Sequence, residues 1–233
     1  LSNMMDLLLF VTKGICVYST ALREQKGYES PMVNKFVFDS LFSTITNANF
    51  DKAAITKRVE KAIEIRNMLR EEAQKKGVKV DTTFEGCTWE GKPEEFDAKV
   101  ATVGVLNETN EDIRSLKELI TYGVKGMAAY AEHAAVLGFH KSEIDDFMLE
   151  ALASTTKDLS VDEMVGMVMK AGGVAVTTMA LLDEANTSTY GHPEITEVNI
   201  GVGKNPGILI SGHDLKDMDE LLKQTEGTGV DVY

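Results

Sequence analysis

An internal repeat constrains the fold of this chain more than any other feature of its sequence. Residues 7–19 (LLLFVTKGICVYS) align with residues 119–131 (LITYGVKGMAAYA), and both segments contain Lys-Gly-x-x-x-Tyr, 112 positions apart. Residues 40–53 align in the same way with residues 151–164, where Leu-x-Ser-Thr and a following aspartate recur at an offset of 111. Two matches in the same order at nearly the same offset predict a duplicated structural unit.

Each copy of this unit is predicted to form three helices. In the first helix, apolar residues at spacings of three and four form one face. They are Leu7, Leu8, Val11, Ile15, Tyr18 and Leu22. The second helix is expected over about residues 33–48, with its inward side chains being Phe36, Leu41, Phe42 and Ile45. The third begins near Asp51, and its apolar residues are Ile55, Val59, Ala62, Ile65 and Leu69.

The third helix of the second copy has an explicit start. Ser160 and Glu163 have the spacing of a capping box, in which each side chain satisfies a backbone N–H of the other residue. We expect the helix to end by about Ala185. Its predicted inward residues are Met164, Val168, Ala171, Ala175, Met179 and Leu182. Its methionines are interpreted as core-filling side chains: Met164, Met167, Met169 and Met179.

The repeat also places a glycine in the middle of the first helix of each copy. A glycine there costs about 1 kcal/mol relative to alanine. Gly14 and Gly126 are therefore predicted to mark close backbone approach between helices.

The pattern changes near residue 190, after a polar linker. Residues 196–203 (TEVNIGVG) are β-branched, and GILISG has the fully apolar character of a strand buried in a parallel sheet. A helical pattern and a second strand, GVDVY, follow and complete a βαβ unit. We therefore expect a mainly α protein: residues 1–190 form a helical domain of two duplicated three-helix bundles (about 1–80 and 110–186). Residues 197–233 form the first βαβ piece of a truncated α/β domain.

The end of the apolar strand is the strongest candidate for a site. Ser211, Gly212 and His213 lie at the carboxyl end, where ligands gather in open α/β sheets. An imidazole there could be a metal ligand or a proton-transfer group. The alternative is that His213 caps the following helix or bonds to a neighbouring loop. Asp214 could support that histidine or cap the helix.

The other candidates are interpreted as structural. His133 is expected to be a satisfied or half-exposed helical histidine, His140 to complement the C-terminal dipole of a helix, and His192 to lie in the linker. Cys87 and Trp89 are predicted to form a small packing cluster. The glycine-rich residues 201–207 precede a strand rather than a helix, so they lack the arrangement of a phosphate loop.

Composition excludes several classes of function. The net charge of −13 argues against a nucleic-acid partner. Two cysteines cannot supply the four thiolates of an iron–sulfur cubane, and their scarcity suits a cytoplasmic protein. The longest apolar run, residues 7–11, is too short to span a bilayer. Neither end resembles a natural terminus, which predicts a fragment.

Longer motifs carry a resemblance to a known family. DLLLFVTKGICVYS, KGMAAYAEHAAVLG, EALASTTKDLSVDEMV and VNIGVGKNPGILISGHDLKD, followed by LLKQTEGTGVDVY, together resemble the hybrid cluster proteins, also called prismane proteins or hydroxylamine reductases. The resemblance covers residues 5–233. It implies a parent more than twice as long, with two α/β domains after the helical one. The parent would hold an iron–sulfur cubane and a hybrid iron–sulfur–oxygen cluster, and would reduce hydroxylamine to ammonia and water, or nitric oxide.

The resemblance assigns a role to one residue of this chain. His213 matches the family histidine that binds iron of the hybrid cluster, whereas the other ligands fall outside residues 1–233 and Cys16 and Cys87 match none. The resemblance therefore implies that the chain alone has no catalytic residue, binds no cluster and is inactive. The parent would use a small nitrogen substrate and an electron-donor protein, bind neither nucleic acid nor membrane, and be compatible with a homo-oligomer. A non-catalytic helical scaffold or interaction module is the alternative from another class.

Overall fold

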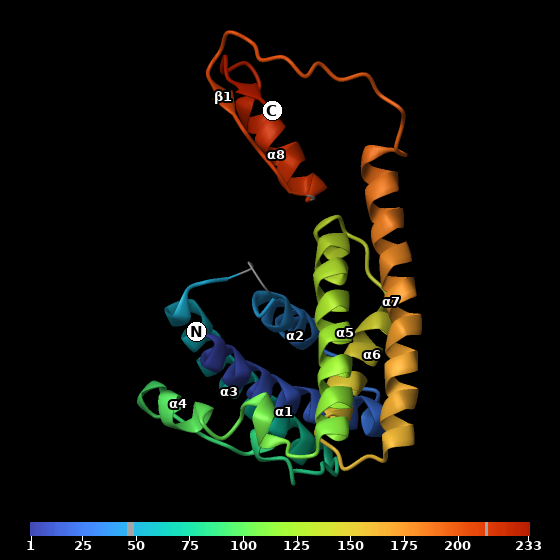
Figure 1. Ribbon diagram of the computed structural model, residues 1–233. Coiled ribbons are helices and arrows are strands. Elements are labelled where there is room, and N and C mark those ends of the chain that lie inside the picture. The colour runs from blue at the N-terminus through green and yellow to red at the C-terminus, as the bar shows by residue number, and fades with distance from the viewer. Residues whose placement is uncertain (46–48, 213) are drawn as a thin grey trace.

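A computed structural model describes residues 1–45, 49–212 and 214–233, and it confirms a mainly α protein with the start of an α/β domain (Figure 1). The helices of the first copy are α1 (Ser2–Lys26), α2 (Pro31–Ser43) and α3 (Lys52–Lys76). Those of the second are α5 (Glu111–Val136), α6 (Ser142–Ser154) and α7 (Val161–Tyr190). Between them lie η1 (Glu85–Cys87), α4 (Pro93–Val100) and η2 (Val105–Asn107). Strand β1 (Gly207–Ile208), helix α8 (Leu215–Thr225) and strand β2 (Asp231–Val232) complete the described elements.

Local capping explains where several helices begin. The Ser160 hydroxyl accepts a hydrogen bond from the Glu163 N–H (3.3 Å), and the Glu163 carboxylate accepts one from the Ser160 N–H (2.8 Å), which confirms the predicted capping box. Asp51 caps α3 by accepting from the Ala53 N–H at 2.8 Å. These side chains satisfy backbone donors that the first helical turn leaves without partners.

The second helix of each copy connects the two copies. Helices α1 and α3 pack side by side, as do α5 and α7, but α6 packs most extensively on α1, and α2 on α5 (Figure 1). Arg23 on α1 pairs with Asp146 on α6 at 2.6 Å, and Lys35 on α2 pairs with Glu132 on α5 at 2.9 Å. Buried residues from both copies consequently form one continuous hydrophobic cluster.

Two predicted helix ends are wrong. Helix α2 ends at Ser43, well before residue 48, although residues 46–48 lie outside the described part of the chain. Helix α7 continues past Ala185 to Tyr190 and ends at Gly191, whose φ of 87° lies in the region that favours glycine. The threonines near its end bond back to carbonyls one turn earlier, as Thr187 does to Asp183 at 2.7 Å, so their polar side chains do not end the helix.

The apolar residues of α7 are only partly buried. Met164 is buried, but Met169 is 72% exposed and Met179 is 48% exposed, so the interpretation of these two methionines as core is wrong. The reason is that α7 packs chiefly against α5 and only its inner face, which includes Ala171 and Leu181, reaches the core. An exposed apolar face remains along the helix.

Helices α1 and α7 both have the length and hydropathy of a bilayer span, and a core helix of a soluble protein can meet the same criteria. The most apolar window of α1 is 61% buried in the core, whereas that of α7 is only 17% buried. The sequence analysis considered only the longest uninterrupted apolar run, residues 7–11. It therefore overlooked the high mean hydropathy of both helices over a longer window.

The repeated glycines have different roles. A Cβ at Gly14 would collide with the carbonyl oxygen of Gly86, so close backbone approach is confirmed, although the partner is the short 3-10 helix η1 and not another α-helix. A Cβ at Gly126 would meet nothing within 4 Å, so the same prediction is wrong in the second copy. Duplication has preserved the residue but not its packing environment.

The connection around η1 forms the predicted packing cluster. Cys87 is fully buried, and the Trp89 ring lies 6.3 Å from the Phe10 ring and 5.8 Å from the Phe96 ring. The buried guanidinium of Arg66 donates to the Gly86 carbonyl at 3.2 Å and pairs with Glu90 at 2.9 Å. Arg66 therefore holds this connection against α3.

The C-terminal piece is a minimal βαβ unit. Strands β1 and β2 are parallel, with Gly207 opposite Asp231 and Ile208 opposite Val232. The prediction of a buried strand is wrong within this structure, because Leu209 at its end is 87% exposed. A sheet of two strands with one helix cannot cover both of its faces. Residues 196–203, whose β-branched composition is typical of strands, form no strand.

Candidate functional site

His213, the principal candidate, lies outside the described residues, so its neighbours define the site. The Ile210 N–H donates to the Tyr233 carbonyl at 2.9 Å and so extends the parallel ladder beyond β1. The chain then turns at Gly212, whose φ of 138° lies in the range L-residues rarely adopt. The predicted sharp turn at the carboxyl end of the strand is confirmed at Gly212.

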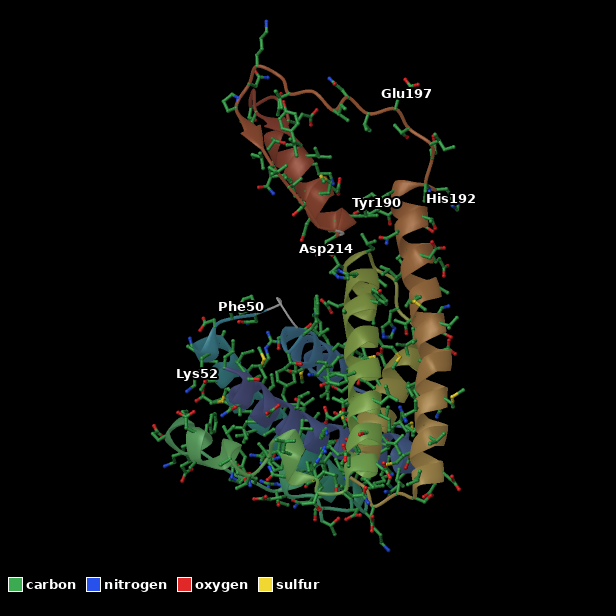
Figure 2. All side chains as sticks on the ribbon, in the orientation of Figure 1. Phe50, Lys52, Tyr190, His192, Glu197 and Asp214 are labelled. Carbon is green, nitrogen blue, oxygen red and sulfur yellow. The ribbon has the colours of Figure 1, made fainter. Side chains whose placement is uncertain are left out.

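Asp214 begins α8 and faces the helical domain. It occupies the N-cap position, but within the described chain its carboxylate does not make the capping hydrogen bond. Its Oδ1 lies instead 3.3 Å from the Nε2 of His133 on α5. Figure 2 shows Asp214 at the start of α8, near the C-terminal end of α5. Of the two roles predicted for Asp214, the side-chain cap is therefore not observed.

His133 connects this residue to the helical core. Its side chain is 26% exposed, in agreement with the predicted half-exposed helical histidine. Its ring meets the Phe42 ring edge-on, with centroids 5.6 Å apart and planes at 75°. The aromatic contact fixes the orientation in which the imidazole reaches Asp214.

A cavity of about 510 Å³ opens beside this contact. The end of α5 contributes Tyr130 and His133, α7 contributes Leu182 and Asn186, and the start of α8 contributes Asp214. The cavity therefore lies where the helical domain meets the residues that flank His213.

The remaining histidines are separate from this cavity. His140 lies beyond the end of α5, and its Nε2 is 2.6 Å from the Oδ2 of Asp145 on α6. The expectation that His140 complements a helix dipole did not include this partner, a buried carboxylate. His192 follows the end of α7 and is exposed in the linker, as predicted.

The described residues do not by themselves form a metal site. In residues 1–45, 49–212 and 214–233, no group of three or more histidine, cysteine, aspartate or glutamate side chains converges in a metal-binding arrangement. Burial raises the pKa of the Cys16 thiol, and burial raises that of Cys87 to about 11. Both side chains therefore favour the thiol, whereas iron binds the thiolate.

The sequence interpretation missed the contact between His133 and Asp214. His133 and Asp214 are 81 positions apart, and neither lies in a motif that relates it to the other. It also missed that Lys13 and Lys125, the matched lysines of the repeat, line one cavity. For these lysines the repeat itself was a usable signal.

Comparison with known proteins gives one consistent assignment. The Prismane/CO dehydrogenase family matches residues 1–233. The chain is 61% identical over 238 residues to a hydroxylamine reductase of Nitratidesulfovibrio vulgaris, covering all of this chain and 43% of that protein. Hydroxylamine reductases of Clostridium novyi and Bacteroides fragilis are 57% and 55% identical over 234 and 233 residues, and the chain covers 42% of each. The chain thus spans less than half the length of these relatives, and it belongs to the Prismane/CO dehydrogenase family.

Proposed function

We propose that this chain is part of a hydroxylamine reductase, in which two electrons and two protons convert hydroxylamine to ammonia and water. The observation that carries the proposal is the high identity to proteins of that name over the entire chain. Because the chain covers less than half of each relative, we assign the activity to a longer protein and expect the chain alone to be inactive.

The proposed cofactors of the longer protein are an iron–sulfur cubane and a hybrid iron–sulfur–oxygen cluster. Such groups supply electrons and an open iron position for the substrate. The described residues do not fit a complete cluster, since they offer no converging set of ligands. We therefore propose a limited role for this chain, which is to present His213 as one neutral imidazole ligand.

The neighbours of His213 suit that role. Gly212 permits the turn that follows the strand, and the contact between Asp214 and His133 fixes the start of α8 against α5. A ligating histidine needs such support because its ring orientation sets the direction of the donor nitrogen. We propose that Asp214 and His133 are positioning residues for this turn.

The test is to replace His213 by alanine in the full-length protein and measure iron content and hydroxylamine turnover. We expect both to fall, and His192→Ala, in the exposed linker, to change neither. Normal iron content and normal turnover in His213→Ala would contradict the ligand assignment. Parallel assays with nitric oxide would show which nitrogen substrate the longer protein reduces faster.

The proposed setting is cytoplasmic, with an electron-donor protein as partner. The acidic net charge of −13 does not favour nucleic acid, and we propose no membrane attachment. On this proposal the exposed apolar face of α7 contacts protein rather than lipid.

A further inference from the structure

The internal repeat brings four charged side chains together. Asp6 precedes Lys13 by seven positions, and Glu118 precedes Lys125 by seven. Seven residues are about two helical turns, so each carboxylate and lysine occupy one face of their helix. All four line one cavity of about 390 Å³ between α1 and α5, where α1 passes behind the lower part of α5 (Figure 1).

The remaining lining divides into a charged part and an apolar part. Lys117 pairs with the Glu108 carboxylate at 2.9 Å, and the Arg114 guanidinium donates to the Glu108 carbonyl at 3.2 Å. Other parts of the lining are apolar and include Phe10 and Phe84. The cavity is therefore amphipathic. The charged lining residues that take no part in these two interactions are Asp6, Lys13, Glu118 and Lys125.

The four repeat-related charges do not neutralise one another by direct contact. No ion pair of 4.0 Å or less joins any two of these four described side chains. Burial lowers the pKa of Lys13 and of Lys125, and Glu118 opposes both effects from a distance. Burial likewise raises the pKa of Asp6. These side chains are half-buried and have no ion-pair partner among one another, which is the condition a bound counter-charge would relieve.

The sign of the lining favours an anion. Its basic side chains are Lys13, Arg114, Lys117 and Lys125, whereas its acidic ones are Asp6, Glu108 and Glu118. A basic excess is notable in a chain whose net charge is −13.

We propose that this cavity binds a small organic carboxylate, with the carboxylate group between the ammonium groups of Lys13 and Lys125 and the apolar body against Phe10 and Phe84. The apolar wall distinguishes this ligand class from inorganic oxyanions, which have no apolar surface to bury. The site is independent of the proposed reductase activity.

The test uses benzoate and its uncharged analogue benzamide in calorimetric titrations of the purified chain. We expect benzoate to bind and benzamide not to bind. Lys13→Met and Lys125→Met should each weaken benzoate binding by at least about tenfold, the loss expected for a charged hydrogen bond. The matched control is Lys75→Met, an exposed lysine of α3, which should leave affinity unchanged.

A carboxylate substitution tests the sign of the ligand. Asp6→Asn removes a competing negative charge, so it should strengthen benzoate binding, whereas a site for cations would respond in the opposite direction. Lys13→Arg keeps the charge and should retain binding, which separates loss of charge from loss of folding in Lys13→Met. The proposal is overturned if millimolar benzoate gives no binding, if benzamide binds equally well, or if neither lysine substitution weakens binding in a folded variant.

Discussion

The Nε2 of His133 lies 3.3 Å from the Oδ1 of Asp214, and this contact joins the helical domain to the first turn of α8. Between α7 and β1 the chain forms no helix or strand from Gly191 to Pro206, so it offers little restraint of its own (Figure 2). The position of α8 relative to α5 therefore depends on side-chain contacts such as this one.

The first prediction concerns that contact. His133→Ala should loosen the docking of α8 without unfolding the core, because a partly exposed contact between an imidazole and a carboxylate contributes at most about 1 kcal/mol. Limited proteolysis should then cleave residues 191–206 several times faster than in the unmodified chain. His192→Ala serves as the control. Equal cleavage rates for His133→Ala and the unmodified chain would show that the contact does not hold α8.

The two repeat-related glycines provide a matched pair. Gly14→Ala should destabilise the chain by about 1–3 kcal/mol, since its methyl group collides with the Gly86 backbone and overpacking costs that much. Gly126→Ala should instead stabilise it by up to about 1 kcal/mol, because the site is open and alanine favours helix. Urea unfolding of both variants checks the prediction. Effects of the same sign would contradict the packing difference.

Arg66 should be essential for stability. Arg66→Met leaves the carbonyl of Gly86 and the side chain of Glu90 without this donor, so we expect a loss of about 2–5 kcal/mol in the free energy of unfolding. Lys57→Met, at an exposed position on the same helix, should change it little. Similar unfolding free energies for the two variants would indicate that the η1 connection is held by its aromatic packing alone.

Asp145 should make stability depend on pH. Burial raises the pKa of its carboxyl above 3.8, although His140 and Asn34 oppose that shift. The folded state therefore holds the proton of Asp145 more tightly than the unfolded state does. The resulting contribution to the free energy of unfolding is complete below pH 3.8 and is lost as the pH rises through the folded pKa. Asp145→Asn should remove this decline. Parallel curves of unfolding free energy against pH for both proteins would refute it.

Features that depend on local chemistry could be predicted from the sequence. The capping box at Ser160, the turn at Gly212 and the matched helices all follow from short-range patterns of hydrogen bonding and hydrophobic spacing. The repeat could also have revealed that Lys13 and Lys125 line the same cavity, since duplicated helices present equivalent faces.

Features that depend on what packs against an element could not be predicted. Periodicity identifies the apolar faces of α7 but does not say how many neighbours cover them, so the exposure of Met169 was unforeseen. The same holds for Leu209, whose burial would need layers that two strands and one helix do not supply. The contact between His133 and Asp214 joins distant segments, and no local pattern reports it.

The reciprocal packing of α2 on α5 and of α6 on α1 has a consequence for how this domain can be divided. Separating the two copies between residues 80 and 110 would remove the main partner of α2 and of α6 and uncover apolar surface on both halves. Neither half is therefore expected to be an autonomous folding unit.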